Sequence, residues 1–312
     1  MSVAARGGRA AGGALCLLAL AACAPHTVAL RSESLPRRAE VASVPFFAQE
    51  RYYCGPASLA TVLTWSGLPV TPEDLVDQVY TPGREGSLRT DVVAAARRHG
   101  RLAVPVTRLA DLLSEVAAGH PVLVFQNLAL GWFPRWHFAV AVGYDLDEGE
   151  IVLRSGEEPR RVTPLGTFER TWARGDRWAL VVLPPGQLPR TADESAAVRG
   201  AIGLERAGRL SEAATVYADI ARRWPESHPA LIGLGNARYA LSDPAGAEEA
   251  FRAAIARRPE DPAAWNNLAH ALARQGRRPE ALEAARTALR LGGPDIETYR
   301  ATLQEVSGAG MR

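Results

Sequence analysis

The sequence contains no lysine and only three cysteines among its 312 residues. All 36 basic residues are therefore arginines, and 34 acidic residues balance them to a formal net charge of +2. The arginines occur singly and in pairs, as in Arg37-Arg38 and Arg97-Arg98, which is typical of solvated helix faces. We therefore expect no nucleic-acid partner and no polybasic attraction to a membrane, and we attribute the missing lysine to coding bias.

A long apolar segment is also missing, because the run near the N-terminus, residues 14–22, is too short to span a bilayer. It follows two arginines and ends in the letters LAAC, which match a lipobox whose cysteine is acylated after cleavage. We expect residues 1–22 to be a lipoprotein signal peptide and Cys23 to carry the lipid. The alternative is an ordinary signal peptide with an incidental cysteine.

The expected lipid chains would anchor the protein without a transmembrane helix. Cys23 is followed by Ala24 rather than an acidic residue, which in a Gram-negative cell resembles the default for sorting to the outer membrane. We therefore expect the protein in the cell envelope, attached to the outer membrane and facing the periplasm. Residues 23–40 are polar and contain proline, so they are predicted to form a tether.

The cysteine count isolates one thiol. Cys16 would leave with the signal peptide and Cys23 would be lipidated, which leaves Cys54 without a partner for an internal disulfide. A free cysteine is often a plain buried apolar residue. The residues around Cys54 therefore decide between a structural and a reactive role.

Residues 41–184 show helix patterns followed by strand patterns, which together predict an α+β domain with an antiparallel sheet. The proline-rich stretch 185–193 is predicted to be a linker. The predicted helices lie at 56–65, from 71 onward, at 91–99 and at 109–118, and the predicted strands at 121–126, 138–144, 151–154 and 178–183.

A 34-residue period governs residues 194–306, where Tyr217, Phe251 and Ala285 fall at one phase. This period resembles the tetratricopeptide repeat, in which small residues let paired helices approach and large residues fill the gap. We expect an all-α repeat domain whose cap helix, 296–306, covers the last apolar face. The alternative is a generic helical bundle. Such repeats would offer a surface for a protein partner or for self-association.

Cys54 is followed by glycine and proline at the start of a predicted helix. Its sulfur would face free backbone N–H groups and the positive end of the helix dipole, which stabilise the nucleophilic thiolate. Gln49 lies five residues upstream, where a side-chain amide could join the Cys54 N–H in binding an oxyanion. Taken alone, Gln49 would be interpreted as a surface loop residue.

A thiol nucleophile needs a base, and the sequence contains six histidines. His137 opens an apolar strand pattern, where its side chain would be held beside the helix of Cys54. The alternative for His137 is a hydrogen-bonded core histidine without a catalytic role, and His120, in a helix-to-strand turn, is the alternate base. We therefore predict a Cys54–His137 pair.

Three segments carry a family resemblance: VPFFAQ ending at Gln49, YCGPA around Cys54, and HFAVAVGYD starting at His137. They resemble the double-glycine-leader (bacteriocin-processing) cysteine peptidase family. They are more closely similar to its stand-alone secreted relatives, some of which join the domain to tetratricopeptide repeats in a lipoprotein. The resemblance covers residues 41–184. It implies a papain-like fold and maps the family's Gln, Cys and His onto Gln49, Cys54 and His137.

The sequence departs from the family at the residue that orients the histidine. The family usually has an aspartate on the strand after the histidine strand, and Ser155 stands in that position here. Serine accepts a hydrogen bond but carries no charge to stabilise an imidazolium. Asp145 lies eight residues from His137, about 26 Å away at ~3.3 Å per residue, which is too far unless the hairpin folds back. The orienting residue is therefore Ser155, a residue elsewhere, or absent.

These features predict a cysteine peptidase that hydrolyses peptide bonds and needs no metal or organic cofactor. Amidase or transglutaminase-like transfer would use the same residues. The competing class is a catalytically weak or inactive domain that binds peptides, with the repeats as a scaffold, and a weaker alternative is a structural envelope lipoprotein. The expected partners are a peptide or protein substrate and a protein bound by the repeats.

Overall fold

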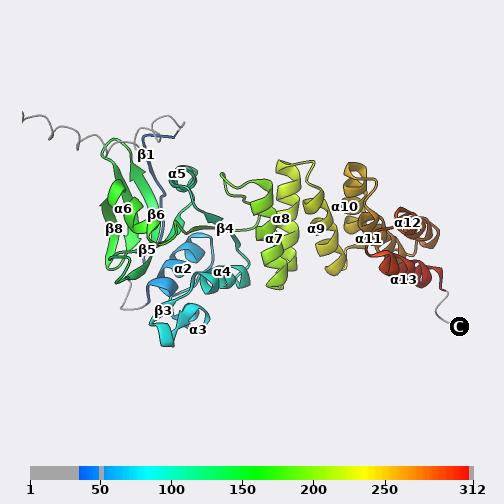
Figure 1. Cartoon of the computed structure of the whole chain (residues 1–312), viewed down its shortest axis with the longest axis horizontal. Helices are drawn as coiled ribbons and strands as arrows, with labels where there is room; N and C mark the ends of the chain where they lie inside the picture. Colours follow the sequence, from blue (N-terminus) through cyan, green and yellow to red (C-terminus); the bar gives the residue numbers. More distant parts are fainter. Residues whose placement is uncertain (1–34, 49–52, 309–312) are drawn as a thin grey trace, which may run out of the picture.

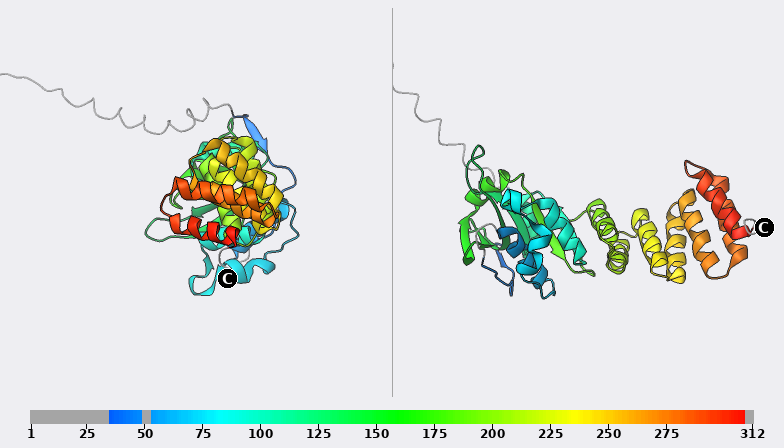
Figure 2. Two further views of the ribbon diagram at one scale, coloured as in Figure 1. Left: turned by 90° about the vertical axis from the view of Figure 1, so that its right-hand side faces the viewer. Right: turned by 90° about the horizontal axis from the view of Figure 1, so that it is seen from below.

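The computed structural model describes residues 35–48 and 53–308 of the chain. In this part of the chain, an antiparallel sheet with helices is followed by seven helices that extend away from one side of it (Figures 1 and 2). This arrangement confirms the predicted fold class of an α+β domain followed by an all-α domain. Within the described residues, no helix combines the length and the apolar character needed to cross a membrane.

The main sheet has the strand order β4-β9-β5-β6-β7-β8, and its neighbours pair antiparallel. A short strand, β1, pairs with the end of β6, where Ala39 lies opposite Tyr144. The last residues of the predicted tether are therefore part of the sheet. The strands are β1 (Arg38–Glu40), β4 (Leu102–Val106), β5 (Val122–Asn127), β6 (Trp136–Asp145), β7 (Glu150–Ser155), β8 (Glu158–Pro164) and β9 (Ala179–Leu183).

The sequence patterns do not predict β4, β8 or the helix α6 (Leu165–Ala173). β4 contains Pro105, which removes a backbone donor and is tolerated because β4 lies at the edge of the sheet. β8 lies at the opposite edge and is mostly exposed, so its sequence lacks the apolar alternation of a half-buried strand. α6 is short, and its four buried side chains, Leu165, Phe168, Thr171 and Trp172, span only about two helical turns.

Helices cover both faces of the sheet. Gly55 of α2 (Cys54–Trp65) lies beside the Phe138 ring of β6, whereas Thr171 of α6 accepts a 2.6 Å hydrogen bond from Gln126 of β5. Gln126 pairs with His137, so its side chain points to the face opposite Phe138. α2 and α6 therefore lie on opposite faces. The smaller elements are η1 (Glu73–Leu75), α3 (Val76–Val79), β2 (Tyr80–Thr81), η2 (Pro82–Arg84), β3 (Gly86–Ser87), α4 (Arg89–Arg98) and α5 (Leu109–Ala117).

The C-terminal helices stack as three antiparallel pairs followed by one last helix, with the 34-residue period predicted from the sequence. Tyr217, Phe251 and Ala285 are all buried. A Cβ at Gly233 would overlap the Tyr217 ring, so glycine at this position lets the two helices approach closely. The helices are α7 (Glu194–Arg206), α8 (Leu210–Arg223), α9 (His228–Ala240), α10 (Pro244–Arg257), α11 (Pro262–Arg274), α12 (Arg278–Leu291) and α13 (Ile296–Ser307).

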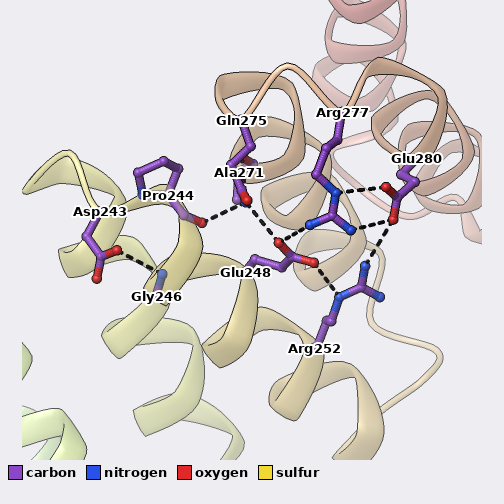
Figure 3. A network of polar contacts seen from close by, with 9 residues as sticks. All are labelled: Asp243, Pro244, Gly246, Glu248, Arg252, Ala271, Gln275, Arg277 and Glu280. Carbon is purple, nitrogen blue, oxygen red and sulfur yellow. Dashed lines mark hydrogen bonds and ion pairs between the residues drawn. The ribbon is translucent and has the colours of Figure 1, made fainter.

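A polar network links successive repeats on their surface (Figure 3). Glu248 of α10 accepts hydrogen bonds from Arg252 at 2.8 Å, Gln275 at 2.9 Å and Arg277 at 2.5 Å. Arg277 also pairs with Glu280 of α12. The network supplements the apolar stacking of the helices with directional contacts between neighbouring repeats.

The repeats share a hydrophobic core with the sheet edge. Leu102 and Val104 of β4 are buried in one cluster with Ala197 and Ala201 of α7. A Cβ at Gly200 of α7 would lie 2.5 Å from the Leu102 side chain, so α7 packs directly on the strand. The sheet and the first repeat therefore form one packed unit, and the segment 185–193 does not act as a free spacer.

A buried carboxylate also fixes the segment between the two parts. Glu115 of α5 is fully buried and accepts hydrogen bonds from the Thr191 N–H and hydroxyl, both at 2.6 Å, and from the Arg190 N–H at 3.2 Å. His120 Nδ1 lies 2.7 Å from the same carboxylate. Burial acts to raise the pKa of Glu115, but the hydrogen bonds from His120 and Thr191 outweigh it and lower the pKa.

Candidate active site

Cys54 is the first residue of α2, so its sulfur lies at the N-terminal end of the helix. The backbone N–H groups of Phe138, Gly55 and Cys54 itself donate to the sulfur. Burial is the larger effect and raises the pKa of the Cys54 thiol above its ordinary value, although these hydrogen bonds lower it. The thiol therefore rests in its neutral form at neutral pH, in contrast to the thiolate that its position on the helix alone predicts.

Gly55 is needed where it lies because β3 approaches the first turn of α2. A Cβ on Gly55 would collide with the Ser87 hydroxyl. Within the described residues, that buried hydroxyl has no hydrogen-bond partner. Since Gly55 directly follows Cys54, this contact places Ser87 at the same end of α2 as the thiol.

His137 lies at the start of β6, beside the end of the antiparallel neighbour β7. Its Nε2 is 2.8 Å from Oγ of Ser155, which is buried and ends β7. An Nε2–H that donates to Ser155 leaves the lone pair on Nδ1 free to accept a proton. The structure thus brings together the predicted base and the serine that stands in the aspartate position.

Three effects keep the His137 imidazole neutral. Burial, Arg161 and Arg135, in that order, lower the pKa of His137 to about 4. Both arginines disfavour a second positive charge on the ring, and Ser155 supplies no negative charge to offset them. His137 is therefore a neutral imidazole over the whole physiological range.

The thiol and the imidazole lie at the same end of β6. Phe138, whose N–H donates to the Cys54 sulfur, directly follows His137 in the strand. Both groups are uncharged at neutral pH, so the site holds no resting thiolate–imidazolium ion pair.

Other predicted residues are placed elsewhere or are not described. Asp145 lies at the far end of β6, where it accepts hydrogen bonds from the N–H groups of Asp147 and Glu148 and cannot reach His137. His120 is committed to Glu115. Gln49 and Cys23 lie outside the described residues, so their roles stay predictions.

Sequence reasoning missed the residues that set the charge of the site. Arg135 and Arg161 act on His137 from the loop before β6 and from β8. The Phe138 amide was also missed, because a backbone donor leaves no trace in residue type. The position of Phe138 next to His137 was the available signal, but using it requires knowing that α2 packs on β6.

Comparison with protein families defines both parts of the chain. Residues 41–177 match the Peptidase_C39 like family, and residues 198–245 and 232–296 match the tetratricopeptide repeat. The chain thus carries a C39-like peptidase domain followed by tetratricopeptide repeats. The matched segments fall within the sheet domain and within the helical stack.

Similar proteins cover one part of the chain at a time. A crystal structure of a C39-like peptidase from Bacillus anthracis has 19% identity, covers 47% of this chain and 98% of its own, and has a TM-score of 0.40. The chaperone SycD of Yersinia enterocolitica has 16% identity, covers 38% of this chain and 86% of its own, and has a TM-score of 0.36. The first repeat domain of Spaghetti (RPAP3), bound to an HSP90 peptide, has 18% identity, covers 38% of this chain and 94% of its own, and has a TM-score of 0.36.

A curated relative matches over a short stretch. The peroxisomal targeting signal receptor of Eremothecium gossypii is 40% identical over 76 residues, which is 24% of this chain. The matched stretch spans 13% of the length of that receptor.

Proposed function

We propose that this chain is a cysteine peptidase with Cys54 as nucleophile and His137 as general base. The observation that carries the proposal is the placement of a partly buried thiol at the N-terminus of α2, hydrogen-bonded by the amide that follows His137. The match of residues 41–177 to the C39-like peptidase family supports the same reaction class. We further propose Gln49 as an oxyanion donor beside the Cys54 N–H.

In the proposed reaction, the Cys54 sulfur attacks the peptide carbonyl carbon while His137 takes the thiol proton. The developing oxyanion is bound by the Cys54 N–H and Gln49. The C–N bond then breaks, His137 gives its proton to the leaving amine, and a thioester forms on Cys54. Water, deprotonated by His137, hydrolyses the thioester to a carboxylic acid and regenerates the thiol.

Ser155 would act in this reaction as a positioning residue. By accepting from Nε2–H it holds the ring in the tautomer whose Nδ1 can accept the thiol proton. It does not stabilise the imidazolium as a carboxylate would. We therefore propose a peptidase whose base is well oriented but weak, with a correspondingly modest rate of the acylation step.

Hydrolysis of a library of fluorogenic peptide amides by the purified full chain tests the proposal. Wild-type protein is expected to cleave part of the library, and Cys54→Ala and His137→Ala are each expected to lower kcat/KM by at least about 10³-fold. Ser155→Ala should retain measurable activity, because it changes only the orientation of the base. Equal hydrolysis by wild type and Cys54→Ala would contradict the proposal.

A second candidate function is a peptide-binding scaffold that does not cleave. The observation that favours it is the charge of the site, because a raised thiol pKa, a His137 pKa of about 4 and two nearby arginines all oppose an ion pair. In this function, the tetratricopeptide repeats would hold the protein partner. Peptide binding that is unaffected by Cys54→Ala, with no hydrolysis by wild type, is the outcome that selects this function.

We also propose that the chain is a lipoprotein of the cell envelope, anchored through Cys23. The lipobox sequence LAAC supports this proposal, since small residues precede the cysteine at the end of a short apolar run. Mass spectrometry of the N-terminal peptide from cell-extracted protein should detect a lipid adduct on Cys23. The Cys23→Ser variant should lack the adduct and leave the detergent phase. An unmodified Cys23 in mature wild-type protein would exclude the anchor.

A further inference from the structure

Exposed apolar side chains are concentrated in the residues that directly precede His137 in the chain. Leu130 is 56% exposed, Trp132 83%, Phe133 72% and Trp136 51%. These four are half of the eight large apolar residues exposed in the described part of the chain, and they fall within seven consecutive positions. A cluster of this kind on a protein surface marks a site that contacts another apolar group.

The β5–β6 loop, residues 128–135, presents this cluster in an ordered form. Asn127 Oδ1 accepts hydrogen bonds from the N–H groups of Ala129 at 3.0 Å and Arg135 at 2.9 Å. Leu128 N–H donates to the Arg135 carbonyl, and Phe133 N–H donates to the Leu130 carbonyl. The loop backbone is therefore held by its own contacts before any partner arrives, which lowers the entropy lost on binding.

An aromatic path connects the loop to the thiol. The Trp136 ring stacks on Phe125, with centroids 5.1 Å apart and an interplanar angle of 12°. The Phe125 ring lies 4.7 Å from that of Phe138, and Phe138 in turn contacts the first turn of α2 and donates its N–H to the Cys54 sulfur. The exposed apolar surface is thus continuous with the packing that positions the nucleophile.

The position of the loop favours a peptide over a membrane as its partner. The chain enters the sheet at β1, which pairs with Gly143, Tyr144 and Asp145 at the far end of β6. At ~3.3 Å per residue, the ten-residue strand separates this entry point from the loop by about 30 Å. A lipid-anchored N-terminal segment would draw the opposite end of the sheet toward the bilayer. A substrate, by contrast, must reach the end of β6 that carries His137.

We infer that the β5–β6 loop recognises an aromatic or large aliphatic side chain of the peptide substrate, with Trp132 and Phe133 as specificity-determining residues. The inference rests on the proposed peptidase function and names its substrate class. Trp132 is five residues from His137, so at ~3.3 Å per residue the recognised side chain lies within about five positions of the scissile bond. Apolar burial against the two rings supplies the preference.

Fluorogenic peptides that carry Phe, Leu, Ser or Asp at each of five positions around the scissile bond test this inference on the full chain. Wild type is expected to prefer Phe or Leu over Ser at one position by at least about tenfold in kcat/KM. Trp132→Ser/Phe133→Ser should erase that preference by lowering kcat/KM for the Phe and Leu peptides toward the value for the Ser peptides. Leu241→Ser is the matched control, because Leu241 is also exposed but lies in the repeats.

Binding separates failure of this inference from failure of the peptidase proposal. Fluorescence anisotropy of the labelled Phe and Ser peptides is measured with Cys54→Ala protein, with and without the loop substitutions. Loss of Phe-peptide binding on loop substitution supports the inference even if wild type cleaves nothing. An unchanged preference in both assays overturns it. Loop-dependent sedimentation with phosphatidylcholine–phosphatidylglycerol vesicles, without an effect on peptides, assigns the loop to a membrane and also overturns it.

The single substitutions Trp132→Ala and Phe133→Ala test the inference separately in case the double variant does not fold. Each is expected to reduce the apolar preference by about threefold or more while the midpoint of thermal unfolding stays within a few degrees of wild type. Full retention of the preference in both single variants and in a folded double variant contradicts the inference.

Discussion

Ser155 can orient the His137 ring through a hydrogen bond, but unlike a carboxylate it supplies no negative charge. The serine hydroxyl lies 2.8 Å from Nε2, but the charges that act on the ring come from Arg161 and Arg135. The imidazole is consequently a weak base, half-protonated at a pH of about 4. A carboxylate in the same position would reverse the balance of charge around the ring.

Ser155→Asp is expected to raise the pKa of His137 by about 1–3 units, because an adjacent negative charge favours the imidazolium. Below its pKa the ring is protonated and cannot serve as a base, so the acid limb of kcat/KM should move to higher pH. The pKa can be measured by NMR titration of the imidazole in Cys54→Ala protein. Ser155→Ala is the control and should leave the pKa low. A His137 pKa that stays near its wild-type value in the Ser155→Asp variant would contradict this account.

Residue chemistry determines how much of the site could be predicted from sequence. Cys54 and His137 can be proposed from sequence because a cysteine before Gly-Pro and a histidine opening an apolar strand are local patterns. Ser155 followed from the family position, although its contact with His137 needed the structure. The effect of Arg161 could not be predicted, since it depends on how β8 returns alongside β7.

Single elements differ in how well their sequences reveal them. The buried strands β5, β6, β7 and β9 were predicted because their apolar residues form short runs. The edges β4 and β8 were not, because edge strands can carry proline and polar residues. The prolines and glycine near 185–193 predict a linker, although the N–H groups of Arg190 and Thr191 in this stretch donate to Glu115.

Glu115→Gln is expected to lower the free energy of unfolding by about 2–4 kcal/mol at pH 7, because a buried carboxylate that accepts four hydrogen bonds loses its charge. The folded-state pKa of Glu115 is lowered, so its contribution is present above the unfolded value of about 4.3 and is lost as the pH falls through the folded value. Urea unfolding at several pH values measures this.

The difference between wild type and Glu115→Gln should therefore shrink at acidic pH. The exposed Glu283 of α12 offers a matched control, and Glu283→Gln should change stability by less than about 0.5 kcal/mol at every pH. A difference for Glu115→Gln that is constant from pH 7 to pH 3 would show that the carboxylate charge is not responsible.

At the scale of the whole molecule, the sheet edge and the first repeat depend on one another. A chain that ends at residue 184 would expose Leu102 and Val104, which α7 covers in the full chain. Exposing two such side chains is expected to cost about 3–6 kcal/mol and to promote aggregation. Thermal unfolding and light scattering of the shortened and full chains measure both effects.

Adding Leu102→Ser and Val104→Ser to the shortened chain provides the control, because it removes the newly exposed apolar stripe. This variant is expected to regain solubility, although not the stability contributed by α7. A shortened chain that is as soluble and as stable as the full chain would mean that the shared core is dispensable.

The core shared by β4 and α7 also bears on how the two parts could cooperate. Two domains joined by a flexible linker have no fixed relative orientation, and the effective concentration of one near the other falls as the linker lengthens. Here the first repeat is packed against the sheet. A polypeptide held by the repeats would consequently reach Cys54 only at the sites along its length that span the fixed separation. In the proposed peptidase, the distance between the repeats and Cys54 would therefore determine which peptide bonds of a long bound polypeptide the thiol could attack.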